Sequence, residues 1–236
     1  MGGRLRVICA LGAVATLLAP AAARAVVGDG TTFTDAVVSW GAPPAQAQVA
    51  VATPFASVVA GPVSTASDRA GNLYAAWSDG HHIWEASSRD QGATWTAPAR
   101  VDVGPGTALL PVVLAGDQGR LAVAYYKTPY SAGDAPGWAF PLDAVWWVSL
   151  AESTGGRVFA ENRATSSVHY GGAPMEPLSL SVDPRTGLAV VTYASDVYDP
   201  RQPAATGCDA ARSNTQACLH VMQAVQTSGP RLLRRR

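Results

Sequence analysis

The chain has few side chains whose types and spacing could support chemistry. Two cysteines in a polar stretch, Cys208 and Cys218, are ten positions apart, which favours a disulfide bond in an exported protein. His220 alone does not complete a zinc-binding set with them, and His81-His82 is an isolated pair. The serine-hydrolase pattern G-x-S-x-G does not occur. We therefore expect no metal site and no cofactor, and we assign no catalytic residue.

A secretory signal is predicted over residues 1–25. Arg4 and Arg6 precede an apolar stretch over Val7–Leu18, and Ala23-Arg24-Ala25 supplies the small residues that signal peptidase accepts. A membrane anchor is the weaker alternative, because about a dozen apolar residues are fewer than the roughly 20 that a spanning helix needs. We expect cleavage after Ala25, secretion of the remaining chain, and contact with a membrane only during export.

The composition excludes two broad classes of protein. Apolar residues make up 48% of the 236 positions, which is enough for a core and excludes wholesale disorder. The 17 basic side chains are balanced by 17 acidic ones, and Lys127 is the single lysine. A nucleic-acid-binding domain usually carries a basic surplus, so no nucleic-acid partner is expected. Because three arginines leave with the signal, the mature chain has a net charge of −3.

One sequence pattern recurs three times after the signal. A short strand follows a proline, an Asp-x-Gly-type turn reverses the chain, and an aromatic residue lies six positions after the glycine. The copies run over residues 62–77, 111–125 and 177–193, and their aromatic residues are Trp77, Tyr125 and Tyr193. A further strand is expected after each copy, over residues 83–87, 145–151 and 219–225. No stretch shows sustained helical periodicity, so the pattern predicts an all-β protein.

A specific motif follows the strand expected over residues 83–87: Ser88-Arg89-Asp90-Gln91-Gly92-Ala93-Thr94-Trp95. It resembles the Asp box of sialidase-like (BNR-repeat) β-propellers at every defined position. The resemblance implies a partial or small β-propeller of four-stranded antiparallel blades, with the box between the third and fourth strands of a blade. It also implies the roles of the box residues: the Asp accepts backbone amides, the Gly allows the reversal, and the Trp packs between sheets. The residues that would take these roles are Ser88, Asp90, Gly92, Thr94 and Trp95.

The resemblance also implies which face of the protein binds a ligand. In the family the substrate lies on the side away from the Asp boxes, where the loops between second and third strands meet. Candidate ligand-binding residues on that face are Asp79, Trp138, Tyr170, Glu176, Tyr198 and Arg201. A glycan or a cell-surface polymer is the expected partner, because aromatic side chains on long loops suit sugars. The alternative is that these aromatic residues only cover their own loops.

Hydrolysis is not the leading expectation. A sialidase holds the substrate carboxylate with three arginines, and here only Arg201 and Arg212 lie in loops of the expected face. Tyr170 with Glu176 is a weak candidate for a nucleophile pair. The leading hypothesis is therefore a secreted propeller segment that binds a glycan or a surface without a complete catalytic set. The alternatives are an exo-α-sialidase whose remaining blades lie outside this chain, and an envelope-associated structural protein.

The domain organisation follows from these assignments. Residues 26–61 form an N-terminal extension or a divergent blade, and residues 62–230 form about three blades. The third copy has no convincing fourth strand, and the segment 28–60 could add a strand. Residues 231–236 are expected to be a solvated basic tail. An array of blades that does not close leaves sheet edges exposed, so self-association through those edges is a further expectation.

Overall fold

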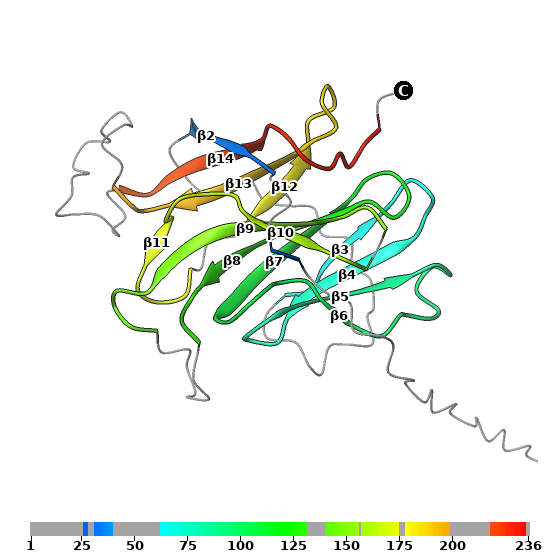
Figure 1. The fold of residues 1–236 in the computed structure, drawn as a ribbon, viewed down its shortest axis with the longest axis horizontal. Helices are drawn as coiled ribbons and strands as arrows, with labels where there is room; N and C mark the ends of the chain where they lie inside the picture. The colour runs from blue at the N-terminus through cyan, green and yellow to red at the C-terminus, as the bar shows by residue number, and fades with distance from the viewer. Residues whose placement is uncertain are drawn as a thin grey trace, which may run out of the picture.

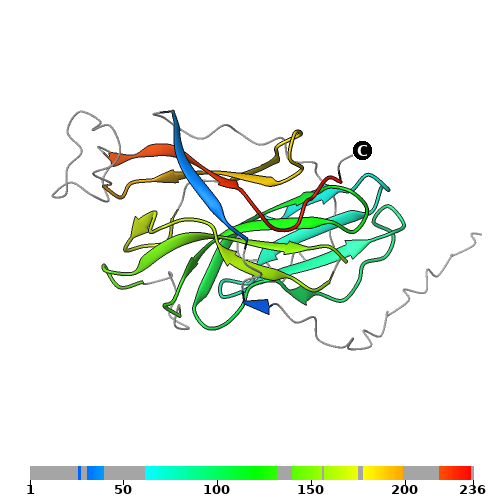
Figure 2. The same cartoon turned by 45° about the horizontal axis from the view of Figure 1, so that its top comes forward.

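The computed structural model describes residues 26–27, 31–39, 62–131, 140–155, 157–174, 178–198 and 218–234. These residues form three largely antiparallel β-sheets and no α-helix, as the repeat pattern predicts. Figures 1 and 2 show the second sheet lying between the first and the third. Within the described ranges, no helix has the length and apolar character needed to span a membrane.

Each sequence copy begins a different sheet. The first sheet has the order β3 (Ser64–Ser67), β4 (Leu73–Ser78), β5 (Ile83–Ser88) and β6 (Ala99–Arg100). The second contains β7 (Thr107–Ala115), β8 (Leu121–Thr128), β9 (Val145–Ser153) and β10 (Ala160–Arg163), with β1 (Val26–Val27) parallel to β10 and β11 (His169–Tyr170) paired with β9. The third has the order β12 (Ser179–Val182), β13 (Ala189–Ser195), β14 (His220–Gln226) and β2 (Phe33–Ser39).

The fourth strand of the third sheet comes from the N-terminal segment. β2 pairs antiparallel with β14, from Phe33 opposite Gln226 to Ser39 opposite Val221. An N-terminal strand and a C-terminal strand are therefore neighbours in the third sheet, and the third repeat gains the strand that its own sequence lacks. Sequence alone suggested only an added strand, because nothing local in residues 28–60 identifies β14 as its partner.

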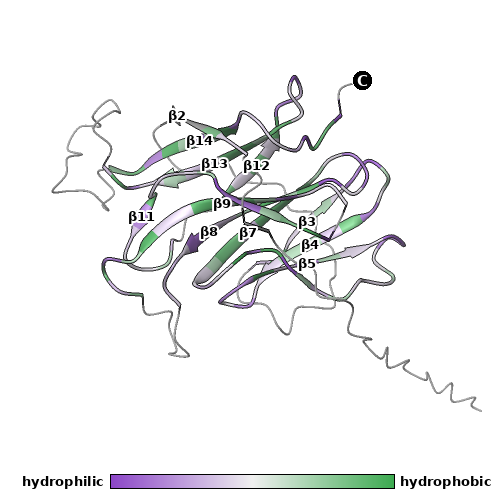
Figure 3. Ribbon diagram, in the orientation of Figure 1, coloured by the Kyte–Doolittle hydropathy of each residue, from purple (hydrophilic) through white to green (hydrophobic). Residues whose placement is uncertain are grey.

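Two apolar layers join the three sheets, and β8 contributes to both. Leu121, Val123 and Tyr125 face the first sheet, whereas the alternate residues Ala122, Ala124 and Tyr126 face the third. All eight residues of β8 are buried, as expected for a strand covered on both faces. Figure 3 shows the apolar residues concentrated along such strands and the hydrophilic residues concentrated in the turns.

The repeated aromatic residues occupy equivalent places. Tyr193 on the third sheet packs in the layer against the second sheet, and Tyr125 on the second sheet packs in the layer against the first. Trp77, at the same position of the first sheet, packs instead with Trp84 and Trp95 on that sheet's outer face. Neither of the other two described sheets covers this outer face of the first sheet.

The C-terminal residues 231–234 do not form a solvated tail, so that expectation is wrong for them. Leu232 is 1% exposed and belongs to the apolar layer between the second and third sheets. Its carbonyl accepts the Asp117 N–H at 2.8 Å, and its N–H donates to the Gly187 carbonyl at 2.8 Å. The sequence does not predict that Leu232 is buried, because a leucine within a basic hexapeptide belongs to no periodic apolar pattern. Residues 235–236 lie outside the described residues.

Candidate functional site

The predicted ligand-binding residues belong to different sheets. Asp79 lies in the β4–β5 turn, Tyr170 in β11, and Tyr198 in the segment that follows β13. Trp138, Glu176 and Arg201 lie outside the described residues, as does Cys208, so the predicted disulfide with the buried Cys218 stays a prediction. Asp79 lines a pocket on the first sheet.

A pocket of about 260 Å³ opens on the outer face of the first sheet. It is lined by Trp77, Asp79, Trp84 and Pro98. The two tryptophans are direct cross-strand partners on β4 and β5, so their side chains share one face. Trp77 is 1% exposed and packs against Trp84, which is half-buried and therefore offers the exposed aromatic surface. The result is an aromatic wall next to a carboxylate.

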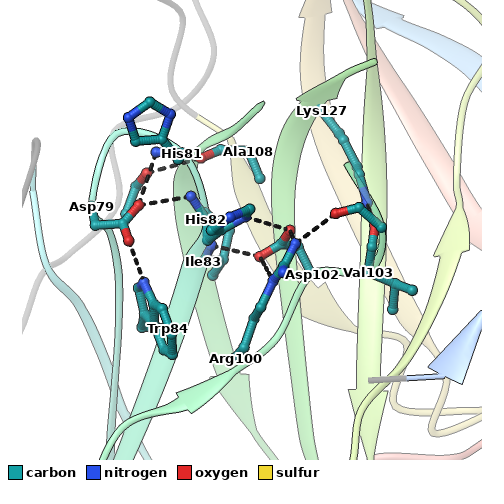
Figure 4. Close-up of polar contacts among 12 residues, drawn as sticks. Asp79, His81, His82, Ile83, Trp84, Arg100, Asp102, Val103, Ala108 and Lys127 are labelled. Atoms are coloured by element: carbon teal, nitrogen blue, oxygen red, sulfur yellow. Dashed lines mark hydrogen bonds and ion pairs between the residues drawn. The ribbon is translucent and has the colours of Figure 1, made fainter. Parts of the chain in front are cut away.

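Asp79 holds the rim of this pocket in place (Figure 4). One carboxylate oxygen accepts the backbone N–H groups of His81 and His82, each at 2.8 Å, and the other accepts the Trp84 indole N–H at 2.7 Å. Burial alone would raise the pKa of Asp79, but these donors, with the His82 backbone first, lower it below its usual value. Asp79 is therefore an anion that fixes the plane of the Trp84 ring.

A second carboxylate organises the polar side of the same turn (Figure 4). Asp102 is buried and accepts the Ile83 backbone N–H and Arg100 Nη2, both at 2.8 Å. His82 Nδ1 lies 3.2 Å from the same carboxylate, so a neutral His82 that donates there presents Nε2 as an acceptor. The hydrogen bond that Arg100 donates to the Asp102 carboxylate is the main cause that raises the pKa of Arg100. His82 and Arg100 keep about a third of their side-chain surface exposed.

Lys127 has a structural place behind this turn. Its ammonium lies 2.8 and 2.7 Å from the two carboxylate oxygens of Glu161, and it also donates to the Val103 carbonyl. Both side chains of the pair are only 8% exposed. The single lysine of the chain thus holds the connection between the first and second sheets and is not available to a surface ligand.

The motif over residues 88–95 forms the β5–β6 connection, at the other end of β5 from the pocket. Asp90 accepts the Thr94 backbone N–H at 2.8 Å, and Ser88 Oγ accepts the Gly92 N–H at 2.8 Å. Gly92 has φ of +92°, a conformation that side chains disfavour. The Trp95 side chain packs on the outer face of the first sheet with Trp77 and Trp84. The motif thus lies between the third and fourth strands of the first sheet, whereas Trp95 packs on an outer face and not between two sheets as the resemblance implies.

Another histidine–aspartate pair joins the second and third sheets. His169 Nδ1 lies 2.9 Å from Asp196 Oδ2, and the Asp196 N–H donates to the Val168 carbonyl. No group of three or more potential metal ligands occurs among the described side chains.

Sequence reasoning identified Asp79 but missed Trp77 and Trp84 as site residues. The available signal was their position on either side of the short Ser78–His82 connection, which makes them cross-strand partners. The repeat pattern accounts for Trp77 as its aromatic residue, but only the tertiary structure shows that Trp77 lies on the face that the other two described sheets leave uncovered.

Comparison with known proteins adds no identification. No protein-family model matches the chain, and no curated protein matches it.

Proposed function

We propose that this chain is a secreted carbohydrate-binding protein and that the Trp77–Trp84 pocket holds a sugar ring. The observation that carries the proposal is the fixed, half-buried indole of Trp84 beside the ionised Asp79. Sugars present C–H groups on the faces of the ring and hydroxyls around its edge. An aromatic wall with polar groups at its rim matches both surfaces.

Polar side chains at and beside the pocket supply donors and acceptors: Asp79 lines the pocket, and Arg100 is the cross-strand partner of Trp84 on β6. Asp79 accepts hydrogen bonds, Arg100 donates them, and His82 can do either. All three are held by hydrogen bonds of the Asp79 and Asp102 carboxylates, so a sugar would meet groups that are already oriented. Preorganisation of this kind reduces the entropic cost of binding.

Binding without hydrolysis is the activity that these groups support. A glycosidase uses two carboxyl groups about 5–9.5 Å apart, and one of them must be protonated to act as the acid. The pKa of Asp79 is lowered, which keeps this carboxyl ionised, and Asp102 is occupied by Ile83, His82 and Arg100. Neither of these two carboxyl groups is therefore suited to protonate a leaving oxygen.

The sialidase-like propeller ancestry and the secretion of the chain are part of this proposal. Three sheets that each begin with the same hairpin support it, as does the Asp-box turn between β5 and β6. The secretion step is tested by expressing the full chain and analysing the culture medium. We expect residues 26–236 there, with a new N-terminus at Val26.

The binding proposal is tested with the mature chain and a panel of immobilised neutral, N-acetylated and sialylated oligosaccharides. We expect retention on at least one class and a loss of about tenfold in affinity for Trp84→Ala, equivalent to about 1.4 kcal/mol. Trp147→Ala is the matched control, because this half-buried tryptophan lies on β9 and contacts Arg163 outside the pocket. Absence of binding to every class, or equal losses in both variants, would contradict the proposal.

Self-association is a second candidate for the same face. The equivalents of Trp77 on the other sheets, Tyr125 and Tyr193, are covered by a neighbouring sheet. A sheet from a second copy could cover Trp77 and Trp84 in the same way, through the open end of the array. Sedimentation velocity separates the candidates: a dimer that Trp84→Ala dissociates favours self-association, and a monomer favours the sugar site.

A further inference from the structure

Glu85 is a buried carboxyl group whose oxygens have no hydrogen-bond partner. The residue is 0% exposed, and neither Oε1 nor Oε2 has a hydrogen-bond donor or acceptor within reach. It alternates with Trp84 along β5, so it faces the second sheet while Trp84 faces the pocket. Its cross-strand neighbours are Ala76 and Ala99. Such a group is stable in this position only without a charge.

Among the described residues, several polar groups share the layer that Glu85 faces, but none is hydrogen-bonded to its carboxyl oxygens. Tyr74 on β4 is electrostatically coupled to it, but the Tyr74 hydroxyl donates to Asp68 Oδ2 at 2.8 Å. From the second sheet, the nearby positive charge is that of Arg157, in the connection between β9 and β10. The second sheet adds Leu121, Val123, Tyr125 and Ala151 to this layer, and by alternation the same face also carries Lys127, Ser149, Ser153 and Glu161. Lys127 and Glu161 form an ion pair with each other.

Arg157 is at the same time a support of the pocket. Its Nη2 donates to the Ala97 carbonyl at 2.8 Å. Ala97 directly precedes Pro98, which lines the pocket, and follows Trp95 and Thr96. One guanidinium group therefore holds the segment that forms one side of the sugar site, across the boundary between two sheets.

We infer that Glu85 and Arg157 form a pH-sensitive switch that controls the Trp77–Trp84 pocket. With Glu85 protonated, Arg157 stays on the Ala97 carbonyl and Pro98 is held against the tryptophans. When Glu85 loses its proton to solvent, the new carboxylate attracts the guanidinium, and the bond to Ala97 is given up. The 96–98 segment then loosens and the pocket loses one wall. This inference rests on the proposed function for its ligand, but the rearrangement itself needs no ligand.

Burial raises the pKa of Glu85 to about 8, and the positive charge of Arg157 partly offsets this rise. The transition is thus expected in mildly alkaline solution. Above it, sugar affinity falls by up to about tenfold per pH unit, which is the limit for a single linked proton.

The switch is tested by tryptophan fluorescence of the mature chain between pH 6 and 10, with no ligand present. We expect one reversible transition near pH 8 in the wild type and none in Glu85→Gln, which keeps the shape but cannot ionise. Arg157→Gln should move the transition to higher pH, because the ionised form loses its stabilising charge. The same transition in Glu85→Gln would overturn the inference.

Amide hydrogen exchange of the wild type provides a second test, which does not depend on whether any variant folds. Exchange at Ala97 and Ala99, corrected for the intrinsic effect of pH, should accelerate across the transition, while exchange in β13 should not. Unchanged protection at these residues would overturn the switch even if Glu85→Gln fails to fold. If the transition occurs but no oligosaccharide binds, the switch stands and the proposed function fails.

Discussion

Asp68 Oδ2 accepts the backbone N–H of Gly119 at 3.0 Å, which joins the first-strand turn of the first sheet to the matching turn of the second. The same oxygen accepts the Tyr74 hydroxyl at 2.8 Å, and Oδ1 accepts the Ala70 N–H at 2.9 Å. Asp68, the aspartate of the repeated Asp-x-Gly-type turn, therefore stabilises its own turn and also connects two sheets. This double use makes its ionisation important for stability.

Asp68→Asn is expected to remove an acid-sensitive part of the stability. Burial would raise the pKa of Asp68, but hydrogen bonds from the Asn72 side chain, the Gly119 N–H and Tyr74 lower it to about 2. A lowered folded-state pKa adds stability that is complete above the ordinary value of 3.8 and is lost as pH falls from there through about 2. Urea unfolding of the wild type between pH 5 and 2 should show this loss. In Asp68→Asn the loss should be smaller, and an identical pH profile would contradict the assignment.

Glu85→Gln is expected to change stability with the opposite pH dependence. Because the folded-state pKa is raised from 4.5 to about 8, the wild type loses stability as pH rises through this interval and levels off above it. The change amounts to about 3–5 kcal/mol across the interval, at roughly 1.4 kcal/mol per pH unit. Free energies of unfolding at pH 5, 7 and 9 measure it. A flat profile for Glu85→Gln beside a falling one for the wild type is the expected result, and parallel profiles would refute it.

Leu232→Ala is expected to destabilise the protein by about 2–5 kcal/mol, since it empties a buried leucine site in the layer between two sheets. Leu142→Ala is the control, because Leu142 is 94% exposed and its truncation removes little packing. Chemical denaturation of both variants provides the comparison. Equal stability of the two would mean that residues 231–234 do not hold the second and third sheets together.

Gly187→Ala is expected to cost more than Gly119→Ala, although the two glycines occupy matching turns. Both have positive φ, at +75° and +71°, so each alanine pays about 1–2 kcal/mol for the left-handed conformation. A Cβ on Gly187 would also lie 2.1 Å from the Leu233 carbonyl oxygen, whereas a Cβ on Gly119 meets nothing within 4 Å. Thermal unfolding should therefore show the larger loss for Gly187→Ala. The reverse order would indicate that the C-terminal segment moves aside freely.

The strand pattern was accessible from sequence because it is local. The alternation along each copy and the Asp and Gly of each turn predict hairpins wherever they occur, and the expected third strands coincide with β5, β9 and β14 to within two residues. Turn chemistry depends on neighbours within a few positions, so it survives without knowledge of the fold.

Partners distant in sequence were decided only by the tertiary structure. The pairing of β2 with β14, the burial of Leu232 and the face on which Trp77 lies depend on contacts between residues that are remote along the chain. Glu85 is the clearest case: its position in β5 follows from periodicity, but its lack of partners follows from the apolar surface that the second sheet places over it. Periodicity assigns a side chain to one of two faces, and only packing determines whether that face meets water, an apolar layer or a ligand.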